Sequence, residues 1–364
     1  MHIPHFRFYK KSDLLGITKI RRFETKLGER VQVLPDDHSA GIFQNIDARY
    51  IVFGVPEDIG VQANEGTGGA STAWVAFLQA FLNTQSNDFL TGDDIAVIGH
   101  FDFSDMQGLI EANAQNPDEQ LLAFRHAVNA IDEEVEKLVK AIAAAGKIPV
   151  VIGGGHNNAY PIIKGAAKGL QQDGQIEIAQ INAINLDAHT DYRPAEGRHS
   201  GNGFRYAEDD GFLQKYCVVG LHENYLQQNV WVDIVNNPFF DCITYEDIFL
   251  HEKRSFLQAV AHAISFTDDN YTGIELDLDS VEGVLSSAAT PSGVMPLHAR
   301  QYVNLAAGNA RCAYLHICEG ATRLHNGKTD DATGKLISYL VSDFVKMHGA
   351  DKTEQPAKVM EASA

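Results

Sequence analysis

Short apolar runs recur along the chain, and longer segments with helical spacing separate them. Seven of these runs are rich in Val, Ile, Leu and aromatic residues, so we predict that each forms a strand. Their apolar residues hardly alternate with polar ones, which indicates strands covered on both faces, as in a parallel sheet. The segments are residues 49–58, 95–103, 148–156, 181–189, 216–223, 271–279 and 312–320.

Segments between these strands carry apolar residues every three or four positions, the spacing of an amphipathic helix. The clearest are 118–146, which ends at a glycine, and 334–347. Strands that alternate with helices predict an α/β protein with three α/β/α layers around a mainly parallel sheet. Residues 1–47 have weaker periodicity and are expected to form an N-terminal extension or cap. We expect one main domain over 48–347 and a flexible polar tail over 348–364.

The charge and composition of the chain limit its partners. A formal net charge of −19 argues against nucleic acid and anionic membranes, so we expect a small-molecule substrate. The first residues contain no long apolar stretch, so we expect no signal peptide, and no apolar run reaches about 18 residues, so we expect no membrane helix. We therefore expect a cytoplasmic protein. Its four cysteines form no C-x-x-C pair and are expected to be reduced and mostly buried: Cys217, Cys242, Cys312 and Cys318.

Polar residues gather at the ends of four predicted strands. In an open parallel sheet, ligands bind at the carboxyl ends of the strands. Residues two apart in an extended chain point to the same side, so two such pairs on neighbouring strands could surround two cations about 3.5–4 Å apart. Oxygen ligands with some imidazole favour Mn²⁺ over a sulfur-rich zinc site. The residues are His156 after one strand, Asp187, His189 and Asp191 after the next, then Asp277 and Asp279, and finally Glu319.

Each of these features has a structural alternative when it is taken alone. A single histidine at a strand end is commonly a hydrogen-bonded structural residue, and a Gly-Gly-Gly run is commonly a turn with positive φ. Taken together, however, the clustered carboxylates would repel one another strongly unless a cation compensated them. We therefore predict a metal site at the carboxyl edge of the sheet.

Three motifs, in this order, resemble those of the ureohydrolase family, which contains arginases, agmatinases and formimidoylglutamases. They are GGGH (153–156), DAHTD (187–191) and DLD (277–279), and Glu319 in HICEG matches a later family glutamate. The resemblance covers residues 48–345 and implies an arginase-like fold whose main domain, 48–347, is catalytic.

The same resemblance implies a binuclear site that binds two Mn²⁺ ions per subunit. A hydroxide between the metals would attack the carbon of a C=N group. Glu319 would accept hydrogen bonds from the substrate's nitrogen atoms, and Asp191 would pass a proton to the leaving amine. One metal would be held by His156, Asp187, Asp191 and Asp277, and the other by Asp187, His189, Asp277 and Asp279, with Asp187 and Asp277 bridging.

Three details favour formimidoylglutamases within this family. Arginases and agmatinases usually have GGDH where this chain has GGGH. Arg193 stands where arginases tend to have asparagine, and an arginine can hold a carboxylate with two hydrogen bonds. Phe204, in SGNGFRYA (200–207), replaces the histidine that shuttles protons in arginases. Because N-formimidoyl-glutamate has two carboxylates, our candidates for substrate binding are Arg193, Asn202 and Arg205, together with Glu319.

Other positions leave the substrate open. Asn157 follows the GGGH motif, where formimidoylglutamases often have glutamate. Glu223 would meet a substrate α-amine if the chain were an arginase. His199 would serve either as a substitute proton carrier or as a surface loop histidine. A glycine-rich segment could shape the rim of the pocket or serve packing alone, through Asn64, Gly66 and Gly69.

We conclude from the sequence that the chain resembles a formimidoylglutamase, which converts N-formimidoyl-L-glutamate and water to L-glutamate and formamide in histidine degradation. One alternative is an arginase, which releases ornithine and urea. A second is a family member that binds metal without catalysis. Since ureohydrolases are commonly trimers or hexamers, we also expect a homo-oligomer.

Overall fold

A nine-stranded sheet forms the centre of the protein, whose computed structural model describes residues 3–35 and 41–350. In sheet order the strands are β1-β3-β2-β4-β9-β8-β5-β6-β7, and every neighbouring pair is parallel except β1 and β3. Among the described residues, the last strand in sequence order, β9, therefore lies in the middle of the sheet. The bounds are β1 Phe6–Phe8, β2 Tyr50–Gly54, β3 Ile95–Phe101, β4 Ile148–Ile152, β5 Ile181–Leu186, β6 Leu213–Leu221, β7 Phe240–Thr244, β8 Thr272–Asp277 and β9 Cys312–Cys318.

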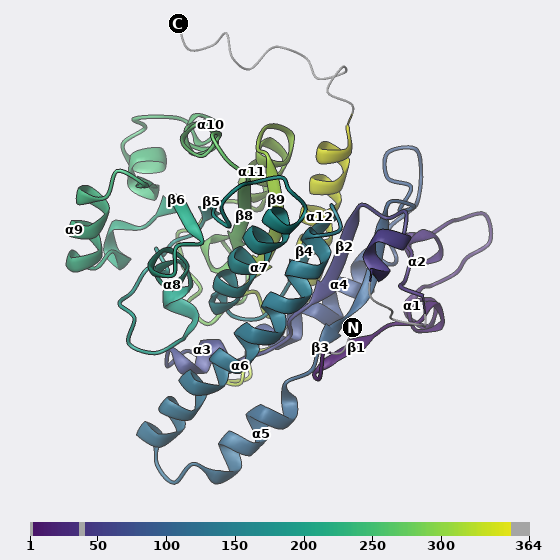
Figure 1. Ribbon diagram of the computed structural model, residues 1–364, viewed down its shortest axis with the longest axis horizontal. Coiled ribbons are helices and arrows are strands. Elements are labelled where there is room, and N and C mark those ends of the chain that lie inside the picture. The colour runs from purple at the N-terminus through teal and green to yellow at the C-terminus, as the bar shows by residue number, and fades with distance from the viewer. Residues whose placement is uncertain (1–2, 36–40, 351–364) are drawn as a thin grey trace, which may run out of the picture.

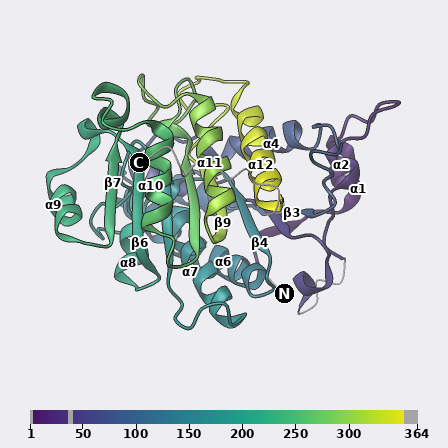
Figure 2. The ribbon, with the colours of Figure 1, turned by 90° about the horizontal axis from the view of Figure 1, so that it is seen from above.

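Helices cover both faces of this sheet, as Figures 1 and 2 show. The pairs α6–α7 and α3–α6 pack together on one face, and α4–α12, α11–α12 and α10–α11 pack together on the other. The helices are α1 Lys11–Ile17, α2 Leu27–Arg30, α3 Ile59–Ala63, α4 Ala73–Phe81, α5 Ser104–Asn113, α6 Pro117–Ala143, α7 Ala159–Gln172, α8 Gly203–Asp209, α9 Gln228–Asn236, α10 Phe256–Phe266, α11 Pro296–Asn309 and α12 Thr333–Gly349.

Successive residues of a central strand enter different apolar clusters, because side chains of a strand alternate between the two faces of the sheet. In β2, Tyr50 and Val52 join the cluster beneath α4, α11 and α12. Ile51 and Phe53 join the cluster beneath α6 and α7. The strands are thus covered on both faces, and the α/β/α layering predicted from the sequence is confirmed.

The seven predicted strands correspond to β2, β3, β4, β5, β6, β8 and β9, and the two clearest predicted helices correspond to α6 and α12. The edge strands β1 and β7 were not predicted. β1 belongs to the segment expected to be an extension or cap, and it pairs with β3 at the sheet edge. The predicted tail lies, from residue 351 onward, outside the described residues.

Two further expectations concern the cysteines and membranes. All four cysteines are free thiols, three of them buried and Cys242 half-buried. Within residues 3–35 and 41–350, no helix is both long and apolar enough to cross a membrane.

Candidate metal centre

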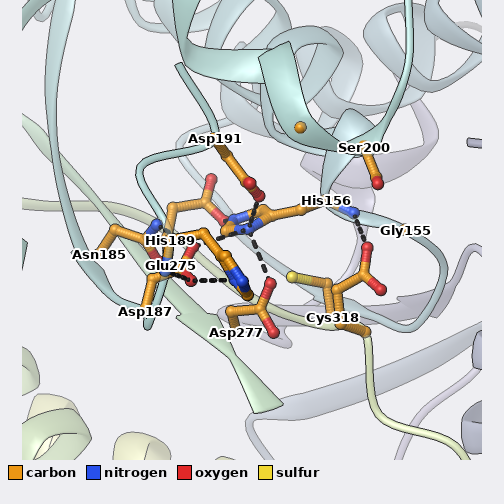
Figure 3. Close-up of polar contacts among 12 residues, drawn as sticks. Gly155, His156, Asn185, Asp187, His189, Asp191, Ser200, Glu275, Asp277 and Cys318 are labelled. Atoms are coloured by element: carbon orange, nitrogen blue, oxygen red, sulfur yellow. Dashed lines mark hydrogen bonds and ion pairs between the residues drawn. The ribbon is translucent and has the colours of Figure 1, made fainter. Parts of the chain in front are cut away.

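The six predicted metal ligands come together at the carboxyl edge of the sheet. They are supplied by β4, β8 and β5, and β9 lies between β4 and β8. Figure 3 labels five of the six, all except Asp279, and shows their side chains pointing toward one another. His156 begins a short 3-10 helix, His156–Asn158, after β4, and Asp187, His189 and Asp191 follow β5. Asp277 ends β8, and Asp279 lies in the following turn, Leu278–Ser280.

The glycine run before His156 allows the chain to turn sharply at the end of β4. Gly153 and Gly154 have φ values of 90° and 77°, in the left-handed region that glycine adopts without strain. A Cβ atom on Gly154 would also lie 2.5 Å from the carbonyl oxygen of Val55. The turn therefore requires glycine, and it sets His156 at the edge of the sheet.

His156 and three aspartates form a first group of candidate ligands, in which the carboxylates face one nitrogen atom of the imidazole. Its Nδ1 lies 2.7 Å from Asp191 Oδ2, 3.1 Å from Asp277 Oδ2 and 3.4 Å from Asp187 Oδ2. One potential ligand atom from each of these residues lies within 4.8 Å of the others. An imidazole nitrogen and three carboxylate oxygens form a donor set that suits a hard divalent cation.

A second group lies beside the first and shares Asp187 with it. His189 Nδ1 is 3.1 Å from Asp279 Oδ2 and 3.6 Å from Asp187 Oδ1. The buried Oδ1 atom of Asp279 accepts no hydrogen bond from any described residue, so it is available to a cation. The second oxygen of Asp277 accepts the backbone N–H of Asp279 at 2.8 Å. By proximity Asp277 belongs to the first group and Asp187 to both, and the bridging of two metals by Asp187 and Asp277 stays a prediction.

Without a cation, the protonation of these carboxyl groups is strongly perturbed. Burial and the neighbouring Asp187 raise the pKa of Asp191 to about 6. Burial and Asp279 raise the pKa of Glu319 to about 8. Burial, with Asp279 and Asp187, also raises the pKa of Asp277. Bound cations would compensate the repulsion between these carboxylates and stabilise their ionised forms, so the residues present fit a pair of metal ions.

A cavity of about 240 Å³ opens beside both groups. Glu319 lines this cavity and accepts the backbone N–H of His156 at 2.9 Å. Glu319 and Asp191 have positive φ values of 61° and 43°, which are uncommon for residues other than glycine. Of the residues singled out in the sequence, the cavity is lined by Asn64, His189, Asp191, Arg193, Asp277, Asp279 and Glu319.

Arg193 is the one predicted substrate-binding arginine that reaches this cavity. Its Nη1 donates a hydrogen bond to Asn64 Oδ1 at 2.7 Å, and its side chain is 39% exposed. Arg205 points elsewhere, with ion pairs of 3.0 Å to Asp209 and 3.2 Å to Asp233.

Asn202 does not line the cavity either, because its buried amide is used within the loop. It accepts hydrogen bonds from Arg198 and from the backbone of His199. His199 itself is buried rather than on the surface, and its Nδ1 accepts the backbone N–H of Gly201 at 3.1 Å. Burial lowers the pKa of His199 to about 3, which keeps its ring neutral.

Three other positions considered in the sequence serve the surroundings of the site. Phe204 is buried. Its ring stacks on that of Tyr216 with 4.1 Å between the ring centroids, and it meets the ring of His156 edge-on with 5.1 Å between the centroids. Glu223 is exposed and does not line the cavity. Gly66 and Gly69 also lie outside the lining and pack closely against neighbouring chain segments.

Several cavity residues were not identified from the sequence. Tyr225 lines the cavity and stacks on the ring of His189 at 4.9 Å. It belongs to the loop after β6 that drew attention only through Glu223. The polar character of this loop, which follows a strand at the carboxyl edge of the sheet, is the feature of the sequence that could have identified Tyr225. The other unidentified lining residues are Thr190, Ser200, Gly201, Gln227, Ser287 and Ala288.

Known proteins resemble this chain in sequence. The family model described as the arginase family matches residues 48–342. Formimidoylglutamases from Streptococcus pyogenes serotypes M3 and M49 are each 27% identical to it over 177 residues, which is 47% of this chain and 52% of each relative. The chain thus spans about half the length of the curated relatives it matches.

Solved structures resemble the fold over nearly the whole chain. A formimidoylglutamase from Bacillus subtilis has a TM-score of 0.69 at 16% identity, with 91% of this chain and 94% of that chain covered. Formiminoglutamase from Trypanosoma cruzi with Mn²⁺ has a TM-score of 0.65 at 20% identity, with 92% and 100% covered. At these identities the likeness shows the fold alone. From the extent of the family match, together with this fold, we conclude that the chain belongs to the arginase family.

Proposed function

We propose that the protein is a manganese-dependent hydrolase of a linear amidine, and that its substrate is N-formimidoyl-L-glutamate. The products would be L-glutamate and formamide. The observation that carries this proposal is the pair of ligand groups sharing Asp187, next to a cavity that also exposes Arg193. The names of the relatives, formimidoylglutamases, support the same substrate, and the Mn²⁺ in the Trypanosoma cruzi structure supports the metal.

The chemistry of the ligands supports two Mn²⁺ ions. His156, Asp187, Asp191 and Asp277 would hold one, and Asp187, His189 and Asp279 the other. Carboxylate and imidazole ligands suit Mn²⁺. When bound, the metal pair supplies an activated water molecule at neutral pH and Lewis-acid polarisation of the substrate.

The protein itself orients the amidine and moves protons. Glu319 borders the cavity through a carboxylate that can accept hydrogen bonds from the amidine N–H groups. Asp191 lines the same cavity and would deliver a proton to the nitrogen atom that leaves with glutamate. Protonation of that nitrogen makes it a better leaving group as the C–N bond breaks.

Arg193 would select a substrate that carries a carboxylate. Asn64 holds its guanidinium at the cavity, so the side chain loses less conformational entropy when it binds a substrate. A guanidinium can form two parallel hydrogen bonds with one carboxylate. N-formimidoyl-glutamate offers two carboxylates, whereas agmatine offers none.

A paired assay on Mn²⁺-loaded protein tests this function. N-formimidoyl-L-glutamate and L-arginine would be supplied separately, with formamide and urea as the products measured. Formamide without urea is the expected result. Urea would identify an arginase instead, and neither product from protein with two bound Mn²⁺ ions would favour a non-catalytic family member.

We further propose that the enzyme acts in the cytoplasm as a homo-oligomer and takes part in histidine degradation. The free thiols of its cysteines support a reducing compartment. The family resemblance supports the assembly, which light scattering would test.

A further inference from the structure

A buried carboxylate for which the proposed mechanism has no role lies next to His156. Glu275 belongs to β8, two residues before Asp277, and its side chain is fully buried. Across the sheet it is level with His316 of β9. Figure 3 shows Glu275 beside the His156 ring. Because burying a carboxylate is costly, its surroundings have to compensate the charge.

Two side chains of β9 hold this carboxylate in place. Glu275 Oε2 lies 2.6 Å from His316 Nδ1, and Oε1 accepts the hydroxyl of Tyr314 at 2.7 Å. Both partners are also fully buried. His316 thus holds Oε2, and Tyr314 holds only the other oxygen of the carboxylate.

The carboxylate faces the nitrogen of His156 that points away from the candidate ligands. His156 Nε2 is 3.4 Å from Glu275 Oε2 and has no other hydrogen-bond partner among the described residues. This distance is longer than an ordinary hydrogen bond, so the contact is mainly electrostatic. On the opposite side of the ring, Nδ1 faces the carboxylates of the first ligand group.

A neutral imidazole carries its proton on one nitrogen only, and a metal needs the lone pair of the other. If Nδ1 is to bind a cation, the proton has to be on Nε2. There the negative charge of Glu275 stabilises it, whereas without that charge the buried N–H would lose its charged partner.

We propose that Glu275 is a positioning residue, held at Oε2 by His316, that keeps the proton of His156 on Nε2 and so leaves Nδ1 free to bind metal. The inference rests on the proposed function, because it concerns one of the two metal sites. It goes beyond that function in assigning a role to a residue that touches neither metal nor substrate.

The alternative is that Glu275 only joins β8 to β9. Such a role would affect the stability of the sheet and leave metal affinity unchanged. Glu275→Gln separates the two, because glutamine has nearly the same shape but presents an N–H₂ group or a weaker acceptor to His156. Tyr314→Phe is the matched control, since it removes one hydrogen bond between the strands and leaves the carboxylate beside His156.

The experiment is a titration of metal-free protein with Mn²⁺, in which free Mn²⁺ is followed by its electron paramagnetic resonance signal. Thermal unfolding of the metal-free proteins is measured alongside. For Glu275→Gln, we expect the affinity for one of the two ions, that of the His156 group, to fall by about 10- to 100-fold, the range typical when a hydrogen-bond partner of a metal ligand is lost. The other ion, bound by the His189 group, is expected to change by less than about threefold. Tyr314→Phe is expected to lower the melting temperature and to retain both affinities.

Two results would overturn the inference. One is a Glu275→Gln protein that binds both ions as tightly as the wild type. The other is an equal loss of affinity in Tyr314→Phe. If Glu275→Gln does not fold, Glu275→Asp keeps the charge but draws it away from His156, and the same weakening is expected. A wild-type chain that binds no Mn²⁺ would instead refute the proposed function.

Discussion

Replacement of Arg193 by alanine tests substrate selection most directly. The guanidinium lies at the cavity, held by Asn64 at 2.7 Å, and a weaker contact of 3.5 Å joins it to Glu196. A charge-assisted hydrogen bond contributes about 1.5–3 kcal/mol, and the 39% exposure of the side chain favours the lower part of that range. We therefore expect a loss of about 1.5–2.5 kcal/mol, which is roughly a 10- to 70-fold fall in kcat/KM for N-formimidoyl-L-glutamate.

The assay measures formamide release over a range of substrate concentrations. The fall is expected mainly as a rise in KM, with Mn²⁺ content unchanged, because Arg193 would bind ground state and transition state alike. Arg205→Ala is the matched control, since it removes the same charge from a residue paired with Asp209 and Asp233 outside the cavity. A kcat/KM within twofold of the wild type for Arg193→Ala would refute the reasoning, and so would an equal loss in both variants.

Three other predictions concern the metal centre. Asp187→Ala is expected to lose Mn²⁺ from both groups, and activity with it, because both share Asp187; normal turnover with full metal by elemental analysis would contradict this. Phe204→His is expected to lower stability by about 1–3 kcal/mol, because it buries an imidazole against Tyr216, and to release no urea from arginine; urea release would show that position 204 can carry protons. In metal-free protein, burial and Asp279 raise the pKa of Glu319 from 4.5 to about 8, so the folded state keeps a proton that the unfolded chain loses. Its melting temperature should therefore fall as pH rises through this window, and Mn²⁺ should reduce the slope; a metal-free melting temperature that rises from pH 5 to 8 would disagree.

The central strands could be predicted from the sequence because they are buried on both faces and read as unbroken apolar runs. The edge strands lack this property. In β7, the segment FDCIT has partly exposed positions that interrupt the apolar pattern. β1 has only three residues, FRF, with an exposed arginine at its centre. Their strand conformation depends on pairing with β6 and β3, which is a tertiary effect.

The cluster of candidate metal ligands was predictable because short spacings encode most of it: the D-x-H-x-D and D-x-D stretches each place their carboxylates at or just after the end of one strand. The other residues of the site depend on how loops turn. Arg193 and Arg205 are close in sequence, but the intervening loop and the start of α8 direct them apart. Glu275 and His316 were overlooked for a different reason, since each has apolar neighbours on both sides within its strand and does not stand at the strand end. Their partnership appears only when β8 and β9 are aligned.

The place of β9 in the sheet has a consequence for how the protein matures. β9 is the last of the described strands in sequence order, so it is synthesised after the other eight, yet it joins β4 on one side to β8 on the other. His156 and Asp277, which are 121 positions apart, cannot meet until it inserts. The His189 group needs only β5 and β8, which pair directly. The two ion sites would therefore form at different stages of folding. The His189 site would form once β5 and β8 have paired, and the His156 site only when β9 has inserted between β4 and β8. Because such long-range pairing is slow, occupancy of the second ion would report that folding is complete.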